Sequence, residues 1–135
     1  MYLFVYGSLM EGFFNYEKAL VGKIKERQKA WVKGSLYHLE NKGYPALIEG
    51  VSPVEGELLL IEETPELLRI LDQIENYSEE DLLESEYLRE KILVSVEAGQ
   101  ELEAFIYRYN TGSSLNSKDI KIPLPNGSWR AYMQQ

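Results

Sequence analysis

The segment TPELLRILDQIENY, residues 64 to 77, predicts the clearest helix in a chain whose other apolar segments follow strand patterns. Thr64 suits the N-cap, Pro65 suits the first helical position, and Glu66 places a negative charge in the first turn. Apolar residues recur at helical spacing: Leu67, Leu68, Leu71 and Ile74. Asn76 is a suitable end for this helix. With one strong helix, the chain must build most of its fold from strands.

Strand patterns account for most of the remaining sequence. Runs rich in β-branched and aromatic residues predict strands at 2–6, 21–26, 31–39, 54–62, 87–97 and 103–109. The same reading gives a loop at 7–12, a short helix at 14–20, a turn with a short apolar piece at 41–50 and a turn-rich tail at 110–135. This pattern favours an α+β domain whose sheet curls into a small barrel.

Composition limits the chemistry that this chain can use. Its 135 residues fit one domain, 1–135, with a core that needs no disulfide or metal. The absence of cysteine excludes a cysteine nucleophile and thiolate zinc sites, and the single His38 excludes a multi-histidine metal site. The net charge of −8 disfavours nucleic-acid and anionic-membrane partners. No signal peptide or membrane-spanning run is recognisable, so we expect a cytoplasmic protein.

Glu75 does not fit the apolar stripe on which it lies. It follows Leu71 by four residues and Leu68 by seven, so the helix would point a carboxylate toward the core near its C-terminus. Desolvation and the negative end of the helix dipole both raise a carboxyl pKa, which suits acid–base chemistry near neutral pH. The alternative is that the helix ends earlier and leaves Glu75 at the rim.

The segment FVYGSL, residues 4–9, ends the first strand abruptly at Gly7. Two interpretations are open: an ordinary turn, or a pocket built from backbone. A residue without a Cβ lets the chain turn sharply and lets another group approach the backbone closely.

Seven segments in order resemble the γ-glutamylcyclotransferase-like family, most closely its γ-glutamylamine cyclotransferase branch. They are VYGSLMEGFFN, GYPALIEG, VEGELLLI, LDQIENY, YLREKILV, FIYRYN and NGSWRAY. The resemblance spans nearly the whole chain. It implies a small distorted mixed β-barrel with flanking helices. It also implies a reaction in which the α-amine of a γ-glutamyl group attacks its own side-chain carbonyl, releasing 5-oxoproline and an amine without cofactor or metal.

The resemblance also implies roles for individual residues. By position, the substrate loop would be Tyr6, Gly7, Ser8 and Leu9, with Glu75 as the catalytic acid–base residue and Tyr87 and Tyr109 near the pocket. Loop amides could bind the substrate carboxylate, because successive N–H groups can converge on an anion. Ser8 could add a hydroxyl donor, and the two tyrosines could donate hydrogen bonds or close the walls.

Three departures from the family pattern are visible. The spacer between Glu75 and Tyr87, residues 76–86, is long and acidic where short members have a brief one. Asn76 stands where glycine is common, and Ser128 stands where aspartate is common before Trp129.

These departures leave open a second function, that of a non-catalytic module that binds a small carboxylate metabolite in the same pocket. Removal of a γ-glutamyl protecting group from a biosynthetic intermediate would use the same site. The amine portion of the substrate and the oligomeric state are not predicted.

Overall fold

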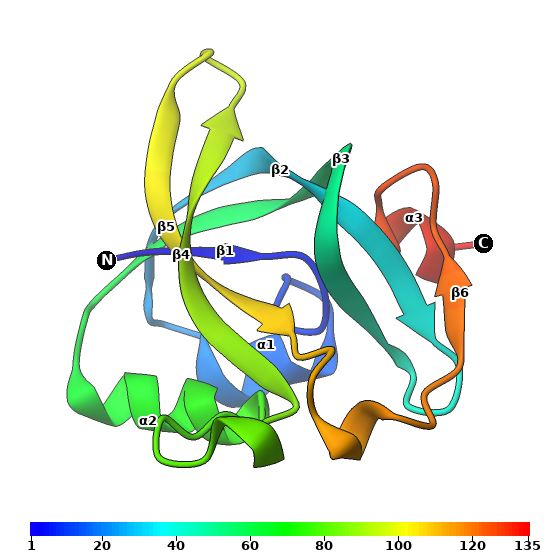
Figure 1. The fold of residues 1–135 in the computed structure, drawn as a ribbon. Helices are drawn as coiled ribbons and strands as arrows, with labels where there is room; N and C mark the ends of the chain where they lie inside the picture. The colour runs from blue at the N-terminus through cyan, green and yellow to red at the C-terminus, as the bar shows by residue number, and fades with distance from the viewer.

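Five strands close into a mixed barrel in the computed structural model, which describes residues 1–135. The order around the barrel is β3-β1-β5-β4-β2, and pairing of β2 with β3 closes it (Figure 1). The β1–β5 pair is parallel and the other pairs are antiparallel. The elements are β1 (Tyr2–Val5), α1 (Phe14–Ala19), β2 (Ile24–Leu39), β3 (Tyr44–Ile61), α2 (Pro65–Ile74), η1 (Leu82–Glu84), β4 (Tyr87–Val96), β5 (Glu101–Tyr109), η2 (Ser114–Asn116), β6 (Lys121–Pro123) and α3 (Trp129–Met133).

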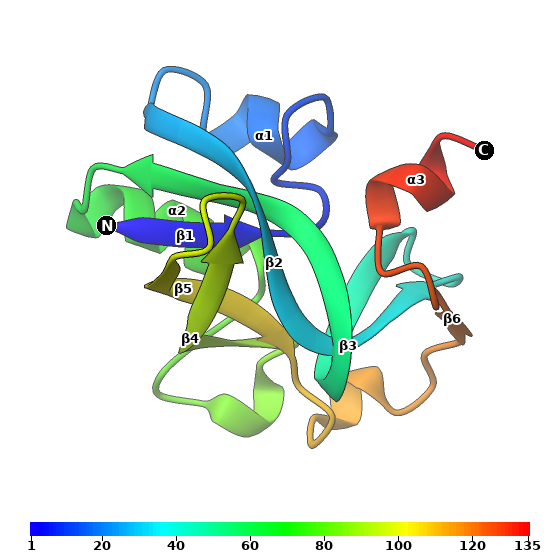
Figure 2. The ribbon, with the colours of Figure 1, turned by 90° about the horizontal axis from the view of Figure 1, so that it is seen from above.

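The long strands β2 and β3 differ from the sequence prediction. Residues 24–39 form one strand instead of two, and 44–61 form its continuous partner. The polar residues between the expected strands lie on a strand face toward solvent, so they do not interrupt the pairing. The register shifts at Gly34, where Gly34 faces Ser52 and Ser35 faces Ile48. This irregularity bends the pair out of the barrel into a hairpin that β6 extends (Figure 2).

Helix α2 begins as the sequence predicts. The Thr64 side chain accepts a hydrogen bond from the Leu67 amide at 3.1 Å, and Pro65 occupies the first helical position. Leu67 and Leu71 are buried, each stabilising the fold by roughly 1.5–3 kcal/mol. In Figure 1, α1 and α2 lie together at one end of the barrel, and α3 lies to the side near β6.

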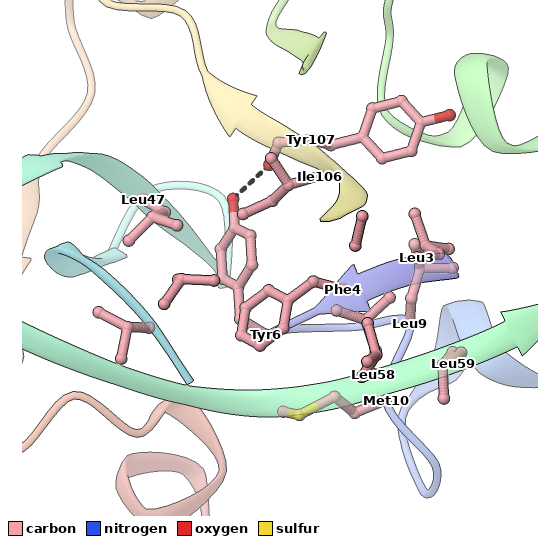
Figure 3. Close-up of a cluster of buried hydrophobic side chains, with 14 of the residues drawn as sticks. Leu3, Phe4, Tyr6, Leu9, Met10, Leu47, Leu58, Leu59, Ile106 and Tyr107 are labelled. Carbon is pink, nitrogen blue, oxygen red and sulfur yellow. Dashed lines mark hydrogen bonds between the residues drawn. The ribbon is translucent and has the colours of Figure 1, made fainter. Parts of the chain in front are cut away.

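A continuous apolar core fills the barrel and includes the side chains of β1. Leu3, Phe4 and Val5 are almost fully buried, and Leu58 and Leu59 pack against them from β3 (Figure 3). Gly56 is required here, because a Cβ at this position would lie 2.2 Å from the Val5 carbonyl oxygen. The chain that leaves β1 at Tyr6 therefore starts from a rigid support.

Candidate active site

A pocket opens where β1 ends, and it brings the loop and Glu75 together. Its volume is about 360 Å³, counting the open mouth. The walls are residues 4–9, Tyr44, Pro45, Glu75, Tyr87 and Tyr107. Of the residues predicted for the site, Tyr6, Gly7, Ser8, Leu9, Glu75 and Tyr87 line this pocket, whereas Tyr109 does not. The loop is thus one wall of a cavity as well as a turn.

Glu75 lies at the C-cap of α2 and reaches the pocket from below the barrel. Its side chain is half-buried and makes no hydrogen bond within the protein. Burial, together with the negative charge of Glu86, raises the pKa of Glu75 to about 8. A carboxyl group with this pKa exchanges protons readily near neutral pH. The pKa of Glu75 is thus raised, as the sequence predicts, and burial is one of the expected causes. The charge of Glu86 is a second cause that the sequence did not reveal.

The loop from Gly7 to Leu9 offers unused backbone donors. The amide N–H groups of Gly7, Ser8 and Leu9 make no hydrogen bond within the protein. The loop is held through its other groups: the Gly7 carbonyl accepts from the Met10 amide at 2.9 Å, and the Ser8 carbonyl accepts from two amides at the start of α1. Asn15 donates through Nδ2 to Ser8 Oγ at 2.6 Å. Free amides on a fixed loop are the feature that an anion-binding site needs.

Gly7 is required because another group approaches its backbone closely, and that group is the side chain of Pro45. A Cβ at this position would lie 2.6 Å from Pro45 Cγ and 2.9 Å from Pro45 Cδ. The proline ring is rigid and also forms part of the pocket wall. Glycine therefore lets β3 close the pocket against the loop.

Three of the pocket tyrosines donate their phenolic hydrogens to groups of the protein itself, so of the two roles expected for Tyr87, closing the wall is the one that its contacts support. Tyr6 donates its phenolic hydrogen to the Tyr107 carbonyl at 2.6 Å (Figure 3), and Tyr87 donates to the Pro45 carbonyl at 2.5 Å. Tyr44 donates to Glu86. Each phenol has one hydrogen to give. Consequently these tyrosines keep only acceptor capacity toward the pocket.

Tyr109 lies behind the pocket. It is buried, stacks edge-on against Tyr87 with ring centroids 5.8 Å apart, and donates to Asp119 Oδ2 at 2.6 Å. Its place is next to Tyr87 across the β4–β5 pair. The structure therefore makes it a support for Tyr87 and gives it no contact with the cavity.

The long spacer returns Tyr87 to the pocket by folding on itself. The Glu86 amide donates to the Asn76 carbonyl at 2.9 Å, which joins the two ends of the segment. Inside it, the Ser78 amide donates to Ser85 Oγ at 2.9 Å, and Ser85 is buried. The extra residues form a closed loop, so the spacer length does not displace Tyr87.

The arginines of β4 and β5 and the single histidine have structural partners. Arg89 pairs with Asp72 at 2.8 Å, and Arg108 pairs with Glu90 at 3.6 Å. His38 is buried and its Nδ1 accepts from Trp129 Nε1 at 3.1 Å. No group of three or more metal-ligating side chains occurs, and no helix is long and apolar enough to span a membrane.

Sequence reasoning missed Tyr44 and Glu86. Both are near the site because β3 and the segment before β4 meet there, which requires the fold to be known. Tyr44 lies within the GYPALIEG segment that carried part of the family resemblance, and that was the available signal. Glu86 directly precedes Tyr87 but resembles the other acids of the spacer.

The sequence of this chain matches a known protein family over nearly its whole length, including every residue of the pocket. The sequence profile of the family described as gamma-glutamyl cyclotransferase, AIG2-like, matches residues 3–131. This chain belongs to that family. The predicted family is thereby confirmed, and the protein is an enzyme of the gamma-glutamylcyclotransferase class.

Relatives extend the comparison over most of the chain. A protein of Methanocaldococcus jannaschii, assigned as a gamma-glutamylcyclotransferase by inference, is 32% identical over 129 residues, which are 89% of this chain and 95% of the relative. The crystal structure of a mouse AIG2-like protein matches with a TM-score of 0.68 and 22% identity, over 95% of this chain and 86% of that one. YkqA from Bacillus subtilis gives a TM-score of 0.70 at 22% identity over 98% of this chain, which spans 40% of YkqA. These two structures show the shared barrel fold.

Proposed function

We propose that this protein releases 5-oxoproline from a γ-glutamyl-amine or γ-glutamyl-peptide, with Glu75 as the general acid and base. The observation that carries the proposal is one pocket lined both by a carboxyl group of pKa about 8 and by a loop, residues 7–9, whose three backbone amides make no hydrogen bond within the protein. The amides of Gly7, Ser8 and Leu9 would bind the substrate α-carboxylate. The scheme uses no cofactor or metal.

The reaction begins with removal of a proton from the substrate α-ammonium group by the Glu75 carboxylate. The free amine then attacks the side-chain carbonyl carbon, and a new carbon–nitrogen bond closes the five-membered ring. Glu75 returns the proton to the leaving nitrogen as the old amide bond breaks, so this nitrogen leaves as an amine. The ring nitrogen still carries one excess proton from the original ammonium group, and it passes this proton through solvent to the released amine, so the products are 5-oxoproline and a protonated amine. One carboxyl group serves both steps because its pKa lies near the working pH.

Most of the remaining acceleration comes from orientation. The nucleophile and the carbonyl belong to the same molecule, so the enzyme has to hold a folded conformation in which they meet. Binding of the α-carboxylate by the loop would fix one end of that conformation, and Glu75 would fix the amine. The loop is held by β1 and by α1, which suits this task.

The test is to incubate the protein with a panel of γ-glutamyl-amines and γ-glutamyl-peptides and to measure 5-oxoproline. We expect product from at least one member, and a Glu75→Gln variant that stays folded and loses about 10²–10⁴-fold in turnover. Glu84→Gln is the matched control, because Glu84 is exposed in the acidic segment 76–86 that follows Glu75 and lies outside the pocket. Full activity in Glu75→Gln would contradict the role of Glu75, and binding without any product would make the protein a binding module.

A further inference from the structure

Arg89, on β4, contacts residues on both sides of Glu75 at the end of α2. Its Nη1 donates to both carboxylate oxygens of Asp72, at 2.8 Å and 2.9 Å. Its guanidinium carbon lies 5.4 Å from the centre of the Tyr77 ring, and its Nη2 donates to Glu79 at 3.3 Å. Asp72 precedes Glu75 in the chain and Tyr77 follows it. One arginine side chain thus joins the two ends of the turn that carries Glu75.

The backbone of this turn is closed on itself. The Glu75 amide donates to the Leu71 carbonyl at 3.0 Å, and the Tyr77 amide donates to the Asp72 carbonyl at 2.9 Å. The Glu75 side chain, by contrast, makes no hydrogen bond within the protein. Its carboxyl group therefore has the position that the turn gives it, so whatever holds the turn also holds the carboxyl group.

The Asp72 carboxylate also connects the turn to the pocket wall. Tyr107 donates its phenolic hydrogen to Asp72 Oδ1 at 2.7 Å, and Tyr107 lies opposite Arg89 in the β4–β5 pair. Tyr107 lines the pocket, its carbonyl accepts from Tyr6, and its ring points away from Tyr6 (Figure 3). Two adjacent strands therefore hold one carboxylate of α2, and both strands also contribute a tyrosine to the pocket.

Arg89 does not belong to the electrostatic surroundings of Glu75. The titratable groups that act on Glu75 are Glu86, Tyr6, Tyr44 and Tyr87. Arg89 bonds to none of these four, and Asp72 balances its charge at 2.8 Å. Loss of Arg89 would therefore act on Glu75 through its position.

We propose that Arg89 is a positioning residue for the reaction: held between Asp72 and Tyr77, it keeps the Glu75 carboxyl group in the pocket. This inference rests on the proposed function, in which Glu75 moves the proton. A planar guanidinium can bond to a carboxylate and stack on an aromatic ring at once, whereas an ammonium group is a compact point charge. The position matters because a misplacement of about 1 Å can reduce turnover on the order of a hundredfold.

The test compares Arg89→Met with Lys91→Met in the full chain. Lys91 lies on the same strand, and the two cations lie over the same Phe105 ring, at 5.8 Å for Arg89 and 5.3 Å for Lys91. Lys91 pairs with Glu103 at 3.7 Å and makes no contact with α2. Both variants remove one positive charge from β4 and keep an unbranched apolar stem. Only Arg89→Met releases the turn.

A first measurement needs no substrate. In Arg89→Met, water should reach Glu75 in the loosened turn, so its pKa should fall from about 8 toward the ordinary 4.5. The Cδ chemical shift of Glu75 would follow this titration by NMR. Lys91→Met should leave the titration unchanged. Arg89→Lys should lie between the two, because it keeps a charged donor for Asp72 without a plane that stacks on Tyr77.

The second measurement is kinetic and uses a substrate found in the panel. Arg89→Met should lower kcat about tenfold to a hundredfold, because the acid–base group is displaced. KM should change less than about threefold, since the loop still binds the α-carboxylate. Lys91→Met should match the wild type in both. Circular dichroism and urea unfolding would give the folded fraction of each variant, and a merely destabilised protein would keep the Glu75 titration in that fraction.

Asp72→Asn is the second variant, to be used where Arg89→Met does not fold. Asparagine keeps the shape of the side chain and one oxygen for Tyr107, while the charge-assisted bond to Arg89 is weakened. It should change the titration and kcat in the same direction as Arg89→Met, by a smaller amount.

Three results would overturn the inference. They are an unaltered Glu75 titration in folded Arg89→Met, a kcat equal to that of Lys91→Met, or unfolding of both Arg89→Met and Asp72→Asn, which would assign the pair to the fold alone. A shifted titration without 5-oxoproline from any substrate would instead reject the proposed function and support the positioning of Glu75 by Arg89.

Discussion

Among single residues, Asn76 explains how α2 ends with Glu75 at the pocket. Its φ of 53° is the only positive φ outside glycine in the chain, and its side chain makes no hydrogen bond. Asparagine tolerates this left-handed conformation better than other residues with a Cβ. This explains why asparagine can stand where the family commonly has glycine.

We therefore expect Asn76→Gly to keep the stability of the wild type within a few tenths of a kcal/mol, and Asn76→Ala to lose about 1 kcal/mol. Urea unfolding followed by circular dichroism would measure both. The alanine variant should also lose activity, since a strained helix end moves the proposed acid–base residue. Equal stability of the two variants would show that the backbone angle is not the reason for asparagine here.

At the scale of elements, the folded segment between α2 and β4 places the negative charge of Glu86 near Glu75. Glu86 is buried, bonded through its amide to the Asn76 carbonyl, and held by Lys42 and Tyr44. Its negative charge opposes ionisation of Glu75. The phenols that also line the pocket have raised pKa values and stay neutral in this range.

Glu86→Gln should accordingly lower the pKa of Glu75, although burial keeps it above the ordinary value. The Glu75 Cδ chemical shift, assigned by its loss in Glu75→Gln, would report the titration by NMR. The acidic limb of the pH–rate profile should move to lower pH in parallel. Glu84→Gln changes the net charge equally and should leave both unchanged. An unaltered Glu75 titration in Glu86→Gln would remove Glu86 from this role.

Some elements are determined by local sequence signals, and others are determined by the strands with which they pair. Helix α2 was predictable because its cap, its proline and its apolar stripe are all local signals. The continuous β2 and β3 were not, since the polar stretch within 27–30 is tolerated only because the pairing strand runs alongside it. The closure of the barrel is likewise a property of the long-range β2–β3 and β1–β5 pairs.

The same division holds at the scale of the whole molecule. Helical periodicity predicted that Glu75 faces the core side of its helix, whereas the abrupt end of the first strand left a turn and a pocket both open at Gly7. The hydrogen-bond roles of the tyrosines could not be predicted, because the partner of Tyr6 is Tyr107, 101 residues away in the sequence. A tyrosine in the sequence is both donor and acceptor, and only the folded chain decides which capacity remains.

Glu75 also couples the stability of the whole molecule to pH. Folding raises its pKa from the ordinary 4.5 to about 8. Between these two values the unfolded chain releases this proton while the folded chain keeps it, so the contribution of Glu75 to stability falls as the pH rises. Above about pH 8 both states are ionised and the loss is complete. Ionised Glu75 in the folded protein thus costs stability, as expected for a charge kept for function.

Glutamine cannot ionise and resembles the protonated side chain in shape. Glu75→Gln should therefore unfold at about the same urea concentration as the wild type near pH 4, and at a clearly higher one near pH 9. The difference should grow steadily between about pH 5 and pH 8, which is the interval set by the two pKa values. Urea titrations of both proteins across this range would measure it. A constant difference at all pH values would mean that Glu75 keeps an ordinary pKa in the folded protein.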